Sequence, residues 1–164
     1  MSEVYLKKAK KTPETGTSET RKIVERMLSE IEIGKETIAK KYASDLDGFN
    51  GDIIVSQESI ENASKMVPEK LKDDIKFAHE RIKKFAEAQK QSISEFETEL
   101  SPGLWAGQKL IPIQTAGCYV PGGRYAHVAS AIMSITTARV AGVENIIACS
   151  APKGEDGPNP AILY

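Results

Sequence analysis

Several features typical of membrane, secreted and nucleic-acid-binding proteins are missing from this chain of 164 residues. No stretch has the apolar length of a membrane span, and the N-terminal stretch lacks the apolar core of a secretion signal. The net charge of -1 leaves no excess of positive charge for a nucleic acid or a membrane surface. We therefore expect a cytoplasmic protein that binds neither nucleic acid nor membrane.

Cysteine and histidine are scarce, with two of each in the chain. Cys118 and Cys149 both lie in apolar, strand-like runs, and in a cytoplasmic protein we expect them to be reduced and buried. His79 has no second metal-ligating side chain one helical turn away, so we interpret it as structural. The sequence offers no histidine pair at the spacing of a metal site, and we assign no metal ligand and no catalytic residue within this chain.

What the chain does contain falls into two regions of different character. Residues 1–92 are predicted to be a charged, N-terminal helical region, whereas residues 93–164 hold eight of the twelve glycines and are typical of strands and turns. Spacing and capping residues predict a helix that ends at Gly34 and a second helix from about 35 to 44 that stops near Asp47-Gly48. Two further helices are predicted at 56–66 and 69–92, with a short strand at 52–56. The last helix is expected to bury one stripe, formed by Leu71, Ile75, Ala78, Ile82, Phe85 and Gln89.

The second region is predicted to begin with a β-hairpin that turns at Pro102-Gly103. It continues with a strand "TAGCYV" (115–120), a helix of small residues that ends at Gly142, and a strand "NIIACS" (145–150). A strand, a helix and a strand in this order predict a right-handed βαβ unit with parallel strands. A last helix is expected at the C-terminal end, with Asn159 as its N-cap.

These elements predict an α/β fold, in which a helical region is followed by the start of a Rossmann-like βαβ domain. Two parallel strands and one helix cannot cover both faces of a sheet. We therefore expect the domain to be truncated, with its remaining strands in a missing C-terminal part. We also expect the helix face near Val128, Ile132 and Ile135 to be exposed in the isolated chain.

The stretch "CYVPGGRYAHVAS" (118–130) is the candidate site. Its Pro-Gly-Gly turn follows a predicted strand at the carboxyl edge of the sheet, where ligands of such folds bind. Glycines let the main chain approach a ligand, the next helix presents its positive end, and Arg124 adds a charge, which suits a phosphate, carboxylate or sulfonate group. The dinucleotide fingerprint GxGxxG is absent, and a plain turn with an exposed Arg124 is the alternative.

At this motif the sequence resembles a known family. The run "AGCYVPGGRYAHVASAIMSITTARVAGVENIIACSAP" is similar to the N-terminal region of histidinol dehydrogenases, and the similarity extends back through "PGLWAGQKLIPI" and "IKFAHERIKKFAEAQ". The resemblance implies a homodimeric enzyme that depends on zinc and NAD and oxidises an amino alcohol to the amino acid through an aldehyde. Family members are considerably longer than this chain, which agrees with the expected truncation.

The resemblance also implies roles for individual residues. Tyr119 matches the family tyrosine that contacts NAD, and Gly122 and Gly123 match its turn, so these three are our predicted cofactor-binding residues. A tyrosine packed into the core at the end of a strand is the alternative for Tyr119. Arg124 and His127 are our predicted substrate-binding residues. The zinc ligands and the acid–base pair of the family are expected in the C-terminal part.

The residues after the Pro-Gly-Gly turn differ from those of most histidinol dehydrogenases. The run "VASAIMS" is more similar to the sulfopropanediol 3-dehydrogenase-like branch, which oxidises 2,3-dihydroxypropane-1-sulfonate to sulfolactate, and Arg124 would suit a sulfonate. We favour this alcohol as the substrate, with L-histidinol, oxidised to L-histidine, as the alternative. If the chain is complete, the alternative to an enzyme is a non-catalytic binding or assembly module. By itself the chain is expected to be inactive.

Overall fold

The computed structural model describes residues 18–122 and 125–164. The chain forms two compact units, one ending at Tyr42 and the other running from Ala43 to Tyr164. Within the described ranges, no helix is long and apolar enough to span a membrane. The described candidate site residues all belong to the second unit.

The first helix, α1, spans Ser18–Asp47 and contains the interruption that the sequence predicts near Gly34. Its backbone leaves the helical conformation at Lys35, where φ is 50° and ψ is -137°. A methyl group on Gly34 would collide with the side chain of Ile38, so a glycine suits this bend. The second helical segment ends at Asp47, in agreement with the predicted stop near Asp47-Gly48.

Two further helices follow, α2 (Gln57–Met66) and α3 (Glu69–Gln91). Ser56 caps α2 as predicted, because its hydroxyl accepts a hydrogen bond from the main-chain N–H of Ser59 at 3.1 Å. At the start of α3, the Lys72 ammonium lies 2.6 Å from the Glu69 carboxylate and lowers the pKa of that carboxyl group. The strand predicted at 52–56 is wrong: Ile53 and Ile54 form a bend, the other residues have no regular structure, and no described strand pairs with them.

The apolar stripe of α3 is confirmed at its centre and wrong at three positions, because Leu71, Phe85 and Gln89 are exposed. Ile75, Ala78 and Ile82 are half-buried, but Phe85 is 66% exposed and Ala86 is buried in its place. A step of four residues from Ile82 leads to Ala86, where a small side chain allows α4 to pack closely. Helix packing, and not the size of the apolar residue, decides which of the two neighbours is buried.

The predicted hairpin is confirmed and consists of the antiparallel strands β1 (Phe96–Ser101) and β2 (Leu104–Gln108). Gly103 adopts a φ of 81° at the turn, and its N–H donates to the Glu99 carboxylate at 2.8 Å. Every residue of both strands is exposed within the chain. The hairpin therefore contributes no buried side chain to the core.

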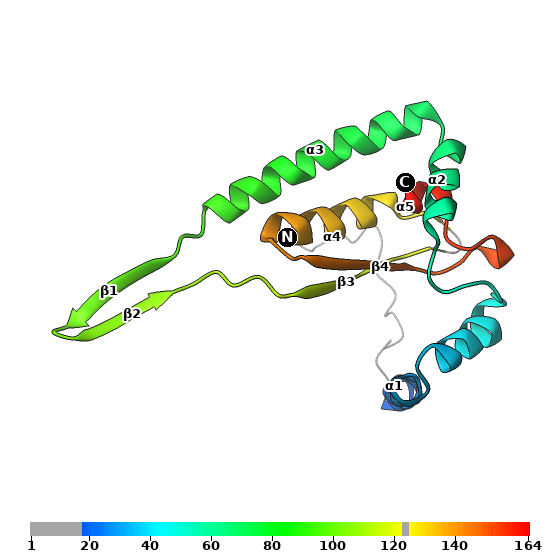
Figure 1. Ribbon diagram of the computed structural model, residues 1–164, viewed down its shortest axis with the longest axis horizontal. Coiled ribbons are helices and arrows are strands. Elements are labelled where there is room, and N and C mark those ends of the chain that lie inside the picture. The colour runs from blue at the N-terminus through cyan, green and yellow to red at the C-terminus, as the bar shows by residue number, and fades with distance from the viewer. Residues whose placement is uncertain (1–17, 123–124) are drawn as a thin grey trace, which may run out of the picture. The chain divides into compact units, whose positions relative to one another are not determined.

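The βαβ unit is also confirmed, and with it the α/β fold. It comprises β3 (Thr115–Val120), α4 (Val128–Ala141) and β4 (Asn145–Ser150), and the two strands pair in parallel. Gly142 ends α4 in the left-handed conformation, with a φ of 96°. Figure 1 shows α4 between α3 and the two-stranded sheet, with packing contacts to both. The boundary predicted between residues 92 and 93 stays a prediction, and α3 and α4 pack together across it.

The β3–β4 sheet has one covered face and one open face. Cys118 and Val120 point toward α4 and are buried, and the exposed fraction of Val120 is 0%. The neighbours on the opposite face, Tyr119 and Ile147, are 69% and 57% exposed. Cys149 shares the open face, so the prediction that both cysteines are buried is wrong for this one.

The C-terminal residues cover part of α4. A short 3₁₀ turn, η1 (Gly154–Asp156), precedes α5 (Pro160–Leu163), and the Asn159 side chain caps α5 as predicted by accepting from the Ala161 N–H at 2.9 Å. Together with α3, this end of the chain borders a pocket that contains Val128, Ile132 and Ile135. These three side chains are half-buried, so the prediction that this face is exposed is wrong.

Candidate functional site

The ends of the two parallel strands lie side by side at the predicted site. Val120 and Ser150 are the last paired residues of β3 and β4, so the chain leaves both strands at the same edge of the sheet. Ligands of open α/β sheets bind at this edge, beyond the carboxyl ends of the strands. Pro121, Gly122 and the segment after Ser150 therefore border one location.

Gly122 fits this location because it has no side chain. A Cβ atom at this residue would lie 2.6 Å from Ser150 Oγ and 2.7 Å from the main-chain oxygen of Ala151. Both distances are shorter than any contact that a real Cβ atom tolerates, and the main-chain oxygen cannot turn away. The need for glycine here comes from close packing between the two strand ends.

Ser150 carries the one buried side-chain oxygen that has no hydrogen-bond partner among the described residues. Leaving a buried hydroxyl group unpaired costs about 1–3 kcal/mol of folding free energy, so such groups are rare and call for an explanation. This oxygen lies directly below Gly122, between the two strand ends. The unpaired oxygen beneath Gly122 is therefore the local sign of a further contact at this edge of the sheet.

Tyr119 lies one residue before Val120 and points to the open face of the sheet. Its side chain is 69% exposed and stands beside Cys149 on the neighbouring strand. The alternative interpretation of Tyr119 as a core tyrosine therefore does not hold within this chain. An aromatic ring at the carboxyl edge of a sheet can stack on a flat ligand group while its hydroxyl bonds to a polar one.

The predicted substrate-binding residues follow the turn. His127 occupies the N-cap position of α4, where its side chain is exposed and makes no capping hydrogen bond. Its main-chain N–H donates to the Pro121 carbonyl at 3.3 Å, which brings the two ends of the loop together, and its own carbonyl accepts from Ser130 at 2.9 Å. Gly123 and Arg124 lie outside the described residues.

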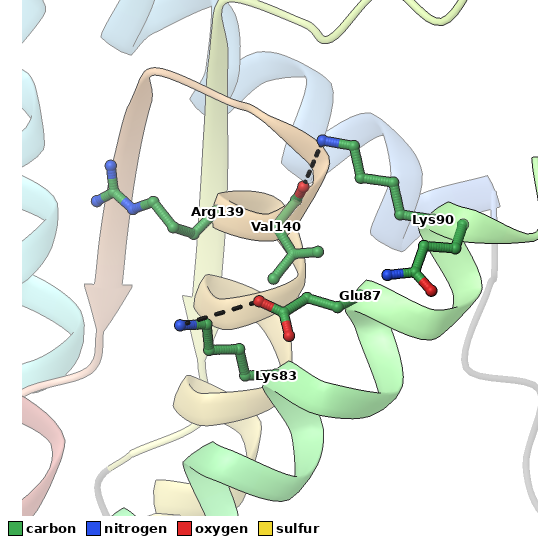
Figure 2. Close-up of a pocket in the computed structure, with 6 residues that line it drawn as sticks. Lys83, Glu87, Lys90, Arg139 and Val140 are labelled. Atoms are coloured by element: carbon green, nitrogen blue, oxygen red, sulfur yellow. Dashed lines mark hydrogen bonds and ion pairs between the residues drawn. The ribbon is translucent and has the colours of Figure 1, made fainter. Parts of the chain in front are cut away.

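A second group of charged side chains lies between α3 and α4 (Figure 2). Lys83 and Glu87 form an ion pair at 3.9 Å, and the ammonium group of Lys90 donates to the main-chain carbonyl of Val140 at 2.9 Å. Val140 lies in the last turn of α4, where carbonyl groups lack helical partners and a cation is favourable. The ion pair lies within α3, whereas the Lys90 hydrogen bond joins α3 to α4, and we interpret the group as structural.

The side chains do not fit a zinc site. Across residues 18–122 and 125–164, no three histidine, cysteine, aspartate or glutamate residues gather closely enough to hold a metal ion. His79 is exposed on α3 and borders the pocket between α3, α4 and α5. A structural zinc site needs four ligands and a catalytic one needs about three, so this part of the chain holds no such site.

Ser150 was missed by the sequence analysis. It is the last residue of the run "NIIACS", where a serine at the end of a strand is unremarkable. Only the register of the parallel pair, in which Val120 lies opposite Ser150, places its hydroxyl under Gly122. The sequence feature that could have indicated Ser150 is the equal length of the two strands, six residues each. Parallel strands of equal length are expected to end side by side, which places the last residue of one beside the last residue of the other.

Comparisons with known proteins identify the family that the chain matches. The sequence model of the histidinol dehydrogenase family matches residues 10–164. The chain is 54% identical to a histidinol dehydrogenase homolog of Pelagibacter ubique, over 100% of this chain and 39% of that protein. It is 51% identical to the sulfopropanediol 3-dehydrogenase of Ruegeria pomeroyi, over 98% of this chain and 37% of that protein.

A solved structure is similar as well. The crystal structure of histidinol dehydrogenase from Elizabethkingia anophelis matches with a TM-score of 0.83 and 29% sequence identity, over 93% of this chain and 35% of that one. The chain therefore spans less than two fifths of the length of these relatives, with 39% the largest of the three shares.

Proposed function

Since the chain belongs to the histidinol dehydrogenase family, we propose that the protein carrying it is an NAD-dependent dehydrogenase. It oxidises a primary alcohol to a carboxylate through an aldehyde and uses two NAD molecules. The observation that carries this proposal is the family match over nearly the whole chain, with the Pro-Gly-Gly turn at the carboxyl edge of the sheet. The native protein is proposed to be a cytoplasmic homodimer.

The proposed cofactor site lies at the ends of β3 and β4. NAD supplies the hydride acceptor for the oxidation when it is bound. Tyr119 offers an exposed ring on the open face of the sheet for contact with the nucleotide. Gly122 and Gly123 let the main chain approach the cofactor, and the positive end of α4 favours its phosphate groups.

The proposed substrate is 2,3-dihydroxypropane-1-sulfonate, which would be converted to sulfolactate. The 51% identity to a sulfopropanediol 3-dehydrogenase, against 32–40% to three histidinol dehydrogenases and 29% to one of known structure, supports this choice. Arg124 and His127 are the proposed substrate contacts, because a guanidinium group can bind two sulfonate oxygens at once. L-Histidinol, which carries a cationic amine, would meet an unfavourable charge at Arg124.

Zinc has no fitting set of ligands among the described residues, and no step of the reaction is derived through it. We propose that the zinc ligands and the catalytic acid–base pair of the family are supplied from outside this chain. The residues of this chain then serve to bind and orient the cofactor and the alcohol.

The test of the proposed function is an assay of the native full-length protein for NADH formation. We expect oxidation of the sulfonated diol with a kcat/KM at least about tenfold above that for L-histidinol, since one charge-assisted contact contributes about 1.5–3 kcal/mol. The control is the same reaction without NAD. Higher kcat/KM for L-histidinol would contradict the substrate, and failure to bind NAD or to oxidise either alcohol would favour a non-catalytic module.

A second expected result concerns Tyr119. Replacing it with alanine should weaken NAD binding by about fivefold to tenfold, because the stacking surface is lost, whereas phenylalanine should retain most of the affinity. Thermal stability should hardly change, since the side chain is 69% exposed. Titration calorimetry with NAD measures the effect, and equal affinities for all three proteins would remove Tyr119 from the cofactor site.

A further inference from the structure

The unpaired hydroxyl of Ser150 has no role in the folded chain as it stands. Its oxygen is buried and makes no hydrogen bond to a described residue. Serine could be replaced at this place by alanine, which would fill nearly the same space without the cost of an unpaired polar group. A group that is costly in the empty protein is expected to find its partner in another state of the protein.

The location of the oxygen identifies that partner. Ser150 Oγ would lie 2.6 Å from a Cβ atom on Gly122, so it directly faces the main chain of the Pro121–Gly122 turn. Among the described residues, a main-chain hydrogen bond from the His127 N–H to the Pro121 carbonyl holds this turn. Since Gly122 already packs closely against Ser150 and Ala151, a rotation of the Pro121–Gly122 peptide group would be enough to turn the Gly122 N–H toward the hydroxyl.

We infer that Ser150 is a positioning residue for the cofactor: its hydroxyl hydrogen-bonds to the main chain of the Pro121–Gly122 turn when NAD is bound. The hydrogen bond would fix the turn against β4 and hold its main chain in the binding geometry. The inference rests on the proposed cofactor site and adds to it a residue from the neighbouring strand. Ser150 does not itself contact the cofactor, because its oxygen is buried beneath the turn.

The test compares NAD affinity with stability in the native full-length protein. Ser150→Ala and Ser150→Cys both remove the hydroxyl, and cysteine keeps the shape of the side chain with a somewhat larger atom that is only a weak hydrogen-bond donor. We expect each variant to bind NAD about threefold to tenfold more weakly, which is the usual effect of one net hydrogen bond. The melting temperature of the protein without NAD should stay equal or rise for Ser150→Ala, because an unpaired polar group is removed.

Ser134→Ala is the matched control. Ser134 is a half-buried serine of α4 whose hydroxyl already donates to the Ser130 carbonyl at 2.7 Å, so its removal should leave NAD affinity unchanged. Unchanged NAD affinity in both Ser150 variants would overturn the inference while leaving the cofactor site in place. A lower melting temperature with unchanged affinity would show a purely structural serine. An unmutated protein that fails to bind NAD would overturn the proposed cofactor site itself, and the inference with it.

Discussion

The Gly122→Ala variant is expected to lose about 2–3 kcal/mol of unfolding free energy and to bind NAD more than about tenfold more weakly. The new methyl group would lie 2.6 Å from Ser150 Oγ and 2.7 Å from the Ala151 oxygen. The serine side chain can rotate, but the Ala151 oxygen belongs to the main chain and moves only if the strand ends separate. Separation would also displace the turn that is proposed to approach the cofactor.

Gly117→Ala is the control for stability. Gly117 lies in β3, five residues earlier, and a Cβ atom there would have no neighbour within 4 Å. Alanine should leave the stability unchanged or raise it by about 0.5–1 kcal/mol, because glycine loses more chain entropy on folding. Denaturant unfolding followed by tryptophan fluorescence and circular dichroism would measure both variants.

A double variant separates the two clashes. Adding Ser150→Ala to Gly122→Ala removes the contact with the hydroxyl but leaves the contact with the Ala151 oxygen, so stability should recover only in part. Full recovery of the unfolding free energy would mean that the contact with the Ser150 hydroxyl causes the whole loss of stability. A Gly122→Ala protein as stable as the unmutated one would mean that the strand ends are not as close as described.

Local chemistry was enough to predict most elements of the second unit. The glycine after α4 and the asparagine before α5 mark helix ends through capping that involves only neighbouring residues, and both are found as predicted. The hairpin around Gly103 is a similar case, because a turn that needs a positive φ is visible in the sequence. Such features depend on a few consecutive residues and not on the rest of the fold.

The errors concern properties that depend on distant residues. Residues 52–56 have the composition of a strand, but no described strand lies beside them to accept their hydrogen bonds. Cys149 lies in an apolar run, yet alternation along β4 turns it to the open face of the sheet. In α3, packing against α4 chooses Ala86 over Phe85. None of these outcomes is encoded within the segment itself.

The candidate site likewise combines one feature that local sequence predicts with one that depends on distant residues. The turn at Gly122 was identified from its position after a strand and from the family resemblance. Ser150 was not, because its contact with Gly122 joins residues 28 positions apart and depends on the strand register. A site built at the meeting of two strand ends requires both strands, and sequence reasoning located only one side of it.

Val120→Ala is the second substitution with a large expected effect. The Val120 side chain is fully buried, with an exposed fraction of 0%, between the β3–β4 sheet and α4. Removing two methyl groups from such a position forfeits their burial and leaves a cavity, so we expect a loss of about 2–3 kcal/mol of unfolding free energy. NAD affinity, measured well below the melting temperature, should change less than in Gly122→Ala, because the turn itself is not altered.

Ile147→Ala provides the comparison, because it removes a larger apolar group from the opposite face of the same sheet. The Ile147 side chain is 57% exposed within this chain, so its truncation should cost less than about 1 kcal/mol. Denaturant unfolding of both variants in the native full-length protein gives the ratio of the two losses. A loss for Ile147→Ala as large as that for Val120→Ala would mean that another part of the native protein covers the open face. Part of the open face beside Tyr119 would then be covered in the native protein and closed to the cofactor. The cofactor would be confined to the edge of the sheet at Gly122 and Ser150.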